Sequence, residues 1–222
     1  MVSVHMNSSP KRHETDGGKR LRKPRVKKPL DETTLRDLAL AYAARFATTG
    51  AKVEAYLARK IRERGVAEDV DGRTRDLDVT GLVTRLIELG YVDDDAYARM
   101  KSRDLTARGY GKRRVEQALW AAGVEEQTRA AHQPSEVEAK RAAVLLARKR
   151  GFGPFGHRID PEAELDIQRA AKEKQIAAML RAGHDFETVR FIIDAPTQDE
   201  IEAWLEEAEA DAEADKEDRS SW

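Results

Sequence analysis

Two groups of cationic side chains are the residues of this sequence best suited to chemistry, and that chemistry is the binding of anions. Lysine and arginine donate charge-assisted hydrogen bonds to phosphate and carboxylate groups. The first group surrounds the segment 108–112, where only Asp104 and Glu116 supply nearby negative charge. It consists of Lys101, Arg103, Arg108, Lys112, Arg113 and Arg114. The second group consists of Lys140, Arg141, Arg148, Lys149 and Arg150.

The consecutive bases at 112–114 add a second argument for an anionic partner. They stand where the sequence predicts a helix to begin, and positive charge at a helix N-terminus opposes the helix dipole. A solvated helix face whose charge is balanced by acids is the ordinary explanation of such a run. The shortage of acids beside this one favours instead a contact with phosphate or with an acidic protein surface.

The sequence does not predict an enzyme. It contains no cysteine, which excludes disulfides and thiol catalysis. No two histidines have the spacing of metal ligands on one helix face, so a zinc site is not expected. No nucleophile lies beside a base, and neither a cofactor nor a metal is expected. We expect surface or loop positions for the five histidines, which are His5, His13, His132, His157 and His184.

Two further motifs have structural explanations. The segment 151–156, Gly-Phe-Gly-Pro-Phe-Gly, lacks both the Lys-Ser/Thr pair and the preceding strand of a phosphate-binding loop. We expect it to be a packed turn. The acids at 93–95 directly precede a predicted helix, where carboxylates cap free N–H groups and complement the helix dipole. Helix capping therefore explains them better than a cation site does.

The elements that must position the cations are helices. Apolar residues make up 40% of the 222 residues and charged residues 36%, and the strong helix formers Ala, Leu, Arg and Glu are abundant. Amphipathic stretches end at Gly65, Gly123 and Gly183, which are 58 and 60 residues apart. No segment alternates as a half-buried strand does. These features predict an all-α protein with about nine helices in three repeated units.

Local patterns place two of these helices. Apolar residues from Leu35 to Phe46 share one helical face, so we expect one helix to include both. Ser135 and Glu138 have the spacing of a capping box, which predicts that a helix begins after Ser135.

The chain divides by charge into a near-neutral body with charged ends. Residues 1–29 hold nine bases and two acids (9 − 2 = +7), and we expect a disordered basic arm. Residues 197–222 hold eleven acids and two bases (2 − 11 = −9), and we expect an amphipathic helix with an acidic tail that frays. We assign the three repeats to residues 30–68, 77–127 and 135–196. No apolar run approaches the roughly 20 residues that span a bilayer, and no secretory signal follows the N-terminus, so a cytoplasmic protein is expected.

The middle of the chain carries an extended motif. It runs Leu86-x-x-Leu89-Gly90-Tyr91-Val92-Asp93-Asp94-Asp95-Ala96-Tyr97-Ala98, then Arg103, then Arg108-Gly109-Tyr110-Gly111-Lys112-Arg113-Arg114-Val115-x-x-x-Leu119-x-x-x-Gly123-Val124. This pattern resembles the signature of the RecX family, bacterial regulators of the recombinase RecA. The resemblance extends more loosely over residues 35–195. One departure is the pair Thr49 and Lys52, where the family has Ser and Glu in a reciprocal cap.

The resemblance implies an elongated, curved array of tandem three-helix repeats that binds the helical groove of the RecA–single-stranded DNA filament. It implies a non-enzymatic regulator, expected to be a monomer, which modulates and usually inhibits recombinase, ATPase and coprotease activity. The processes would be homologous recombination, DNA repair and the SOS response. The two cationic groups are then the candidate contacts to RecA or to DNA.

Two alternatives remain open at the level of sequence. Three-helix units with a glycine-containing turn are also typical of helix-turn-helix modules, which would bind duplex DNA directly. Separately, the acidic tail could fold back on the basic arm or on the basic helix faces and screen them from nucleic acid.

Overall fold

The computed structural model is all-helical, as the composition and periodicity predict. It describes residues 28–69, 71–74, 76–156 and 165–220. Within these ranges the only β-type pairings are two isolated bridges, Leu30–Val66 and Glu68–Thr74. The helices are α1 (Glu32–Ala43), α2 (Gly50–Arg64), α3 (Val79–Glu88), α4 (Asp94–Ala107), α5 (Lys112–Trp120), α6 (Glu126–Ala131), α7 (Glu136–Arg150), the short 3-10 helix η1 (Gly153–Phe155), α8 (Leu165–Arg181), α9 (Phe186–Asp194) and α10 (Gln198–Ser220).

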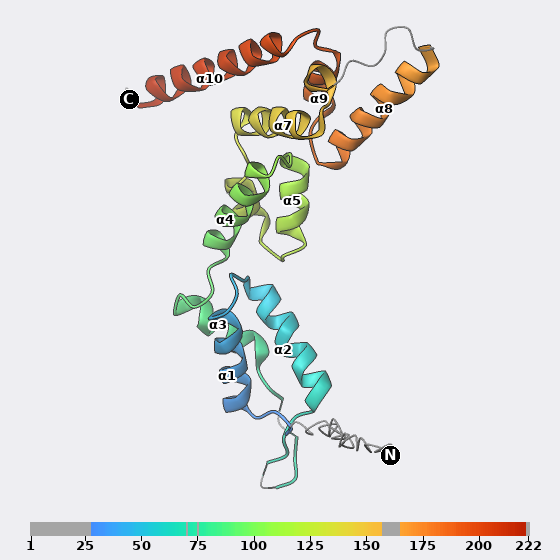
Figure 1. Cartoon of the computed structure of the whole chain (residues 1–222). Helices are drawn as coiled ribbons and strands as arrows, with labels where there is room; N and C mark the ends of the chain where they lie inside the picture. The colour runs from blue at the N-terminus through green and yellow to red at the C-terminus, as the bar shows by residue number, and fades with distance from the viewer. Residues whose placement is uncertain (1–27, 70, 75, 157–164, 221–222) are drawn as a thin grey trace, which may run out of the picture.

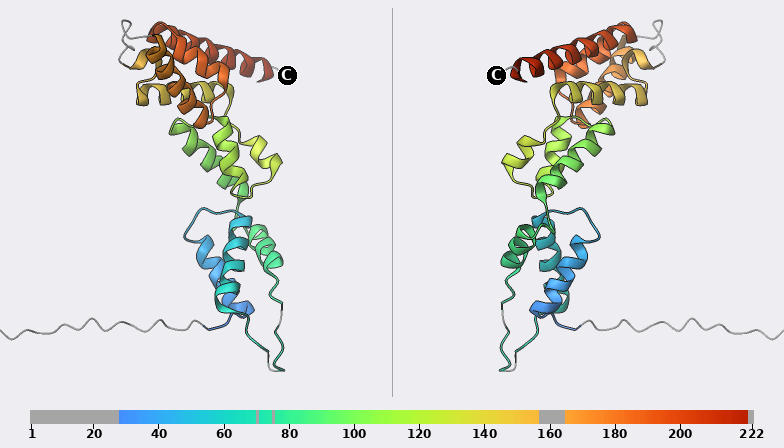
Figure 2. Two further views of the ribbon diagram at one scale, coloured as in Figure 1. Left: turned by 90° about the vertical axis from the view of Figure 1, so that its right-hand side faces the viewer. Right: turned by 90° about the vertical axis from the view of Figure 1, so that its left-hand side faces the viewer.

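The helices form three small bundles stacked into an elongated molecule (Figures 1 and 2). We call α1–α3 the first bundle, α4–α6 the second and α7–α9 the third. The buried apolar side chains separate in the same way, into one cluster around Val53 and Leu57, one around Val115 and Leu119, and one around Met179 and Ile192. Each core is small, so stability depends on contacts between the bundles. No helix in the described ranges is long and apolar enough to cross a membrane.

The repeated glycines mark equivalent places in the three bundles. Gly65, Gly123 and Gly183 follow the last turns of α2, α5 and α8, which are the middle helices of their bundles. Their φ angles are 73°, 75° and 93°, the left-handed region that favours glycine. The repeat inferred from glycine spacing is therefore a repeat of middle helices.

The boundaries of the packed bundles differ from those of the repeats predicted from the sequence. The range 77–127 places α3 in the second repeat, but Val83 and Leu86 of α3 are buried against α1 and α2. The boundary between the first two bundles accordingly lies in the turn after α3. The apolar stripe of α3 fits either neighbour, and only the three-dimensional contacts decide between them.

The structure differs from the sequence-based prediction at the end of α1, and it describes the two chain ends only in part. Helix α1 ends at Ala43, so the prediction that one helix includes Phe46 is wrong. Phe46 is 55% exposed, and its ring lies tilted against Tyr42 with centroids 5.3 Å apart. The expected basic arm lies outside the described residues except for Lys28 and Pro29. The acidic end does not fray in the described range, since α10 continues to Ser220.

Local capping rules explain several helix starts. Ser135 and Glu138 form the predicted capping box at the start of α7. Asp93 accepts a hydrogen bond from the Ala96 N–H at the start of α4, as helix capping predicts for the acids at 93–95. Thr49 caps α2 by accepting from the Lys52 N–H at 3.3 Å, without the reciprocal bond that a Glu at position 52 would add.

Hydrogen bonds join the first and second bundles at the N-terminus of α2. The Thr49 hydroxyl is fully buried and donates to the Ala122 carbonyl oxygen at 2.5 Å. The Gly50 N–H donates to Asp94 Oδ1 at 2.9 Å, and burial raises the pKa of this carboxyl. The Lys52 ammonium contacts the Tyr97 hydroxyl and lies 4.2 Å from its ring centroid. The C-terminal end of α5 therefore lies against the first turn of α2.

This junction yields a test on two adjacent threonines. Thr49→Val keeps the shape of the side chain but removes the hydroxyl that both caps α2 and donates to Ala122. A buried acceptor and a helix N–H lose their partner, so we expect the free energy of unfolding to fall by about 1–3 kcal/mol. Urea denaturation followed by circular dichroism measures it.

Thr48→Val is the matched control. The Thr48 hydroxyl is also buried, but it has no hydrogen-bond partner among the described residues. Its replacement by a methyl group should leave stability unchanged or raise it slightly. Equal losses in the two variants would contradict the bond from Thr49 to Ala122.

Candidate binding surface

The segment Arg108-Gly-Tyr-Gly-Lys112 forms the corner between α4 and α5, and it is also the junction with the third bundle. Gly111 is the N-cap of α5, and no side chain caps this helix. Instead the Gly111 N–H donates to the Ala182 carbonyl oxygen at 2.9 Å, and the Arg113 N–H donates to the Gly183 carbonyl oxygen at 3.1 Å. The C-terminal end of α8 thus satisfies the free N–H groups that begin α5.

This contact changes the electrostatic argument made from the sequence. The cations at 112–114 stand at a helix N-terminus, but they also stand beside the last carbonyl groups of α8, the negative end of that helix. Positive charge there is favourable. The helix-dipole cost that suggested an anionic partner is therefore offset within the protein, and the case for such a partner depends on the exposed cations alone.

The junction leaves no room for side chains between the two backbones. A Cβ at Gly111 would lie 2.4 Å from the Gly183 carbonyl oxygen, and a Cβ at Gly183 would lie 2.4 Å from the Arg114 nitrogen. Glycine at both places allows the backbones to approach. The junction between the first and second bundles is equally close, because a Cβ at Gly123 would lie 2.3 Å from the Cβ of Ala51.

His184 is a buried part of this corner, and its contact was not predicted from the sequence. The expectation was a surface or loop position: His184 does lie in the loop between α8 and α9, but it is buried there, with only 2% exposed. Its Nε2 lies 3.0 Å from the Gly109 carbonyl oxygen, and burial lowers the pKa of the imidazole, so Nε2–H of the neutral ring donates this bond. A signal was available: His184 follows a helix-ending glycine, as the buried Val124 follows Gly123.

His132 is half-buried, and its Nε2 lies 2.6 Å from Asp95 Oδ1. This contact lowers the pKa of the Asp95 carboxyl. It links the end of α6 to the start of α4 and is a structural contact. The other three histidines lie outside the described residues.

Several cations of the first group are held around Tyr110 and Asp104. The guanidinium carbons of Arg108 and Arg114 lie 5.5 and 6.0 Å from the Tyr110 ring centroid. Arg108 lies 3.5 Å and Lys101 3.9 Å from Asp104 Oδ2. These pairs are exposed and therefore weak. The positions of the cations are defined, but their charge remains available to a partner.

Two cations of the second group form ion pairs with acidic residues of α10. Arg141 Nε lies 2.6 Å from Glu209 Oε1, and Arg148 lies 2.5 Å from Glu202 Oε1, both on α10. The bond between Arg141 and Glu209 lowers the pKa of the carboxyl. Lys140 pairs with Glu136 at 3.2 Å and lies 4.7 Å from the Trp204 ring centroid. Helix α7 is thus partly covered by the C-terminal helix.

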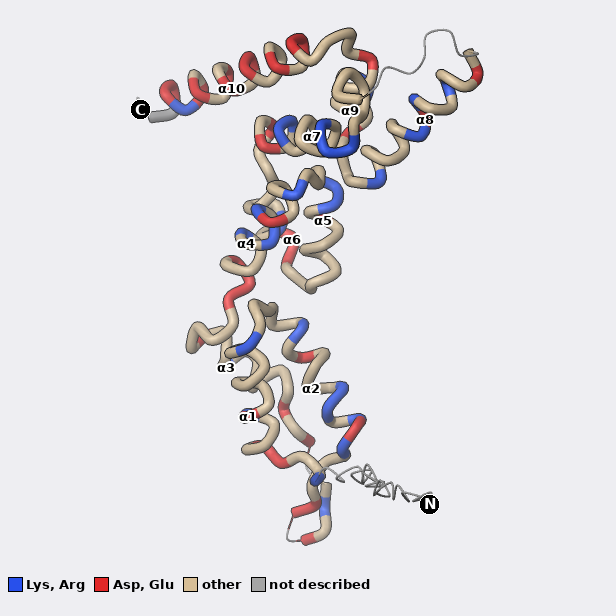
Figure 3. Tube along the Cα trace, viewed as in Figure 1, with Lys and Arg blue, Asp and Glu red and all other residues tan. Residues whose placement is uncertain are grey.

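Other cations of the two groups are exposed and unpaired within the described ranges, and these are Arg103, Lys112, Arg113, Lys149 and Arg150. Helix α8 adds three exposed bases without an ion pair in that part of the chain, namely Arg169, Lys174 and Arg181, which were absent from the predicted set. These bases could have been predicted, because α8 is the middle helix of its bundle, as the cation-bearing α5 is of the second bundle. Blue segments on α5, α7 and α8 mark this surface in Figure 3.

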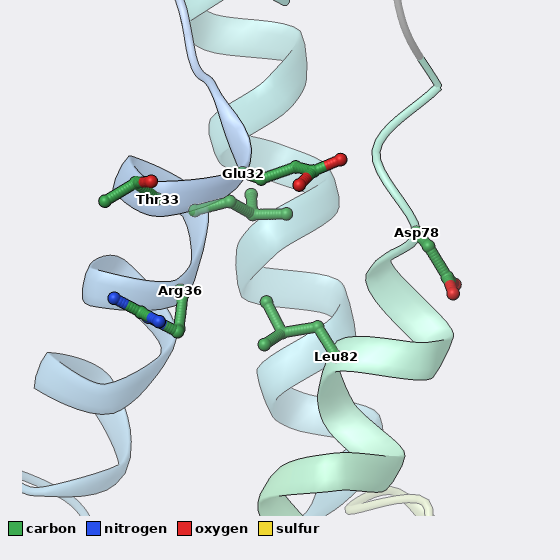
Figure 4. Close-up of a pocket in the computed structure, with 6 residues that line it drawn as sticks. Glu32, Thr33, Arg36, Asp78 and Leu82 are labelled. Carbon is green, nitrogen blue, oxygen red and sulfur yellow. The ribbon is translucent and has the colours of Figure 1, made fainter.

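Two hollows among the described residues are lined by both acids and bases. Lys112 and Lys140 line one of about 610 Å³ with Phe191 and Trp204, but acids on its rim balance their charge. A second, of about 400 Å³, lies between α1 and α3 (Figure 4). One of its acids, Asp78, accepts a bond from the Gly81 N–H as the cap of α3. No group of three or more potential metal ligands occurs in the described part of the chain.

Comparison with known proteins gives consistent matches. Residues 93–131 match the family model described as RecX, second three-helix domain. The Regulatory protein RecX of Myxococcus xanthus is 31% identical over 189 residues, covering 82% of this chain and 97% of that protein. The Regulatory protein RecX of Agrobacterium fabrum is 38% identical over 117 residues, 53% of this chain and 59% of that protein. A crystal structure of RecX from Lactobacillus salivarius aligns with a TM-score of 0.52 at 18% identity, covering 72% of this chain and 93% of that one, and so supports the fold.

The backbone contact at the corner predicts the effect of a single methyl group. Gly111→Ala would place a Cβ against the Gly183 carbonyl oxygen, although its φ of −84° suits any residue. The clash must separate α5 from α8, so we expect the free energy of unfolding to fall by about 2–3 kcal/mol. Lys112→Ala, at the next and exposed position, should change it by less than about 0.5 kcal/mol. Chemical denaturation measures both, and an unaffected Gly111 variant would contradict the contact.

Burial of His184 predicts a pH dependence of stability. The folded-state pKa lies below the ordinary value, so the unfolded chain binds a proton more readily. The free energy of unfolding should therefore decrease as pH falls below about 6.5, by at most about 1.4 kcal/mol per pH unit. His184→Gln keeps a donor near Gly109 but cannot titrate. Urea denaturation at several pH values between 5 and 8 should show a flatter dependence for this variant, and identical curves would exclude the titration of His184 as its cause.

Proposed function

This chain belongs to the RecX family of regulatory proteins, and from this we infer that it regulates the RecA recombinase by binding the filament that RecA forms on single-stranded DNA. The expected result of binding is inhibition of ATP hydrolysis and strand exchange. The protein would act as a monomer in the cytoplasm, where it would take part in DNA repair and the SOS response. It would need no cofactor and make no contact with membranes.

The observation that carries this proposal is the set of unpaired cations around the junction of the second and third bundles. Lys112 and Arg113 on α5 lie beside the end of α8, whose own bases are exposed. Two backbone hydrogen bonds and the bond from the buried His184 hold the junction together. A fixed cationic surface on an elongated stack is suited to a long, repetitive anionic partner, which a nucleoprotein filament is.

The protein would inhibit by occupying the groove of the filament. We expect ATP hydrolysis and strand exchange to require movement of the filament subunits relative to one another. A stack of bundles that contacts several positions along the filament would resist this movement and would exclude a second DNA strand from the same groove. Binding energy supplied through many weak contacts suffices for this effect, and no chemical step is required of the protein.

A direct helix-turn-helix interaction with duplex DNA is the weaker candidate. Such a module inserts the N-terminal residues of its second helix into the major groove. If α4 and α5 form such a helix pair in the second bundle, the inserted helix is α5, and its first turn is bonded to Ala182 and Gly183. The backbone end that would approach the bases is therefore covered by the third bundle. This geometry favours contacts to a phosphate backbone over reading of base edges.

We expect the protein to slow ATP hydrolysis by RecA on single-stranded DNA at substoichiometric ratios. The triple variant Arg113→Ala, Lys149→Ala and Arg150→Ala removes three unpaired cations without touching a buried side chain. Its inhibition should require about tenfold or more protein, because each lost phosphate contact weakens binding and lowers the salt dependence by about 0.7.

The matched control removes three exposed cations from the first bundle, in the variant Arg36→Ala, Arg45→Ala and Arg62→Ala. The net charge change is the same, so an equal loss of inhibition would mean that overall charge and not the proposed surface is responsible. Absence of any effect of the wild-type protein at equimolar RecA would overturn the proposal itself.

A further inference from the structure

Helix α10 lies along α7 with opposite charge. It contains eleven acids and two bases (2 − 11 = −9), whereas α7 contains five bases and two acids (5 − 2 = +3). The two ion pairs between them join Arg141 to Glu209 and Arg148 to Glu202. The acidic helix thus occupies cations that belong to the candidate binding surface.

The two ion pairs are in register. Arg141 and Arg148 are seven residues apart, and so are their partners Glu202 and Glu209 on the antiparallel helix. Seven residues rise about 10.5 Å along an α-helix. Carboxylates at this spacing match cations at the same spacing, so the acidic face of α10 presents α7 with a regular row of negative charge.

Helix α10 makes apolar contacts with the third core and ion pairs with α7, and different residues make these two kinds of contact. Ile201 is fully buried, and Trp204 stacks on Phe191 with centroids 4.6 Å apart, so the first turns of α10 are anchored in the third core. The ion pairs, in contrast, are in contact with solvent, with side chains 37% to 56% exposed. Water and salt can therefore screen these pairs, and another anion can replace the carboxylates without unfolding the bundle.

We propose that α10 is an internal occupant of a strand-binding row on α7, and that single-stranded nucleic acid competes with its carboxylates for Arg141 and Arg148. The unpaired Lys149 and Arg150 lie in the same last turn of α7 as Arg148. A strand held there that extends along α7 to Arg148 and Arg141 would displace Glu202 and then Glu209. This inference rests on the proposed function and adds regulation to the same surface.

A single strand of nucleic acid also fits the spacing of these cations. Phosphates of a stacked strand follow one another at a rise of about 3.4 Å, so every third phosphate recurs at about 10.2 Å, close to the spacing of Arg141 and Arg148. Phe155 lies 5.1 Å from the Arg148 guanidinium and supplies an aromatic ring beside the row, as single-strand sites commonly do.

The test uses the full-length variant Glu202→Gln and Glu209→Gln, which keeps the helix and its core contacts but removes the two competing charges. Binding of a fluorescent oligothymidylate is measured by anisotropy, without RecA, over a range of salt concentrations. We expect about tenfold tighter binding than wild type near 50 mM salt. Two added phosphate contacts steepen the salt dependence by about 1.4, so the gain should nearly vanish near 200 mM.

The control Glu207→Gln and Asp211→Asn removes the same charge from exposed positions of α10 that have no ion pair in the described structure. Its affinity should stay close to wild type. Adding Arg141→Gln and Arg148→Gln to the first variant should cancel its gain. An unchanged affinity of the first variant, or an equal gain in the control, would overturn the proposal, since charge in general would then be responsible.

A third result would also overturn it: unchanged oligonucleotide binding together with tighter association with DNA-free RecA, which would make the row a protein-binding surface. Failure of the inference is distinguishable from failure of the proposed function. Inhibition of the RecA ATPase by wild-type protein tests the function, whereas the oligonucleotide titration contains no RecA and tests only the competition by α10.

Discussion

The stack depends on end-to-end contacts between its middle helices. The carbonyl of Ala122, just beyond the end of α5, accepts a bond from Thr49 at the start of α2. The carbonyls of Ala182 and Gly183, just beyond the end of α8, accept bonds from the start of α5. Each middle helix thus satisfies the free N–H or capping group of the middle helix before it in the chain. The three helices are joined C-terminus to N-terminus, the arrangement in which their dipoles attract. Small residues such as Gly111 and Ala51 are required where the backbones meet.

This arrangement explains why cations and a rigid junction occur together. The end of α8 concentrates carbonyl groups at the corner, and this negative end favours the bases of the first turn of α5. Because the carbonyls are occupied by N–H donors, the side chains of Lys112 and Arg113 remain exposed and unpaired in the described chain. The contact that orients the third bundle on the second therefore also determines where positive charge is presented to a partner.

The sequence predicts what local rules determine. The capping box of Ser135 and Glu138 depends on residues three apart, and the glycine repeat depends on helix ends, so both could be read directly. The assignment of α3 could not, because its apolar stripe gives no information about which neighbour covers it. The burial of His184 and the pairing of Arg141 with Glu209 depend on contacts between distant segments, 75 and 68 residues apart. The two cationic groups around α5 and α7 could be identified from the sequence, but the exposed bases of α8 were not, and which cations are covered could not be predicted.

The positive and negative charges lie on different helices of the molecule, although the net charge is close to zero. With a net charge of −1, long-range attraction to DNA is weak, so local surfaces decide the contacts. The acidic α10 and the cation-bearing α8 project from α9 toward opposite sides (Figures 1 and 3). A polyanionic filament would attract the α8 side and repel the exposed acids of α10. In the proposed function, the exposed acids of α10 would orient the stack, and those paired with α7 would restrict access to Arg141 and Arg148.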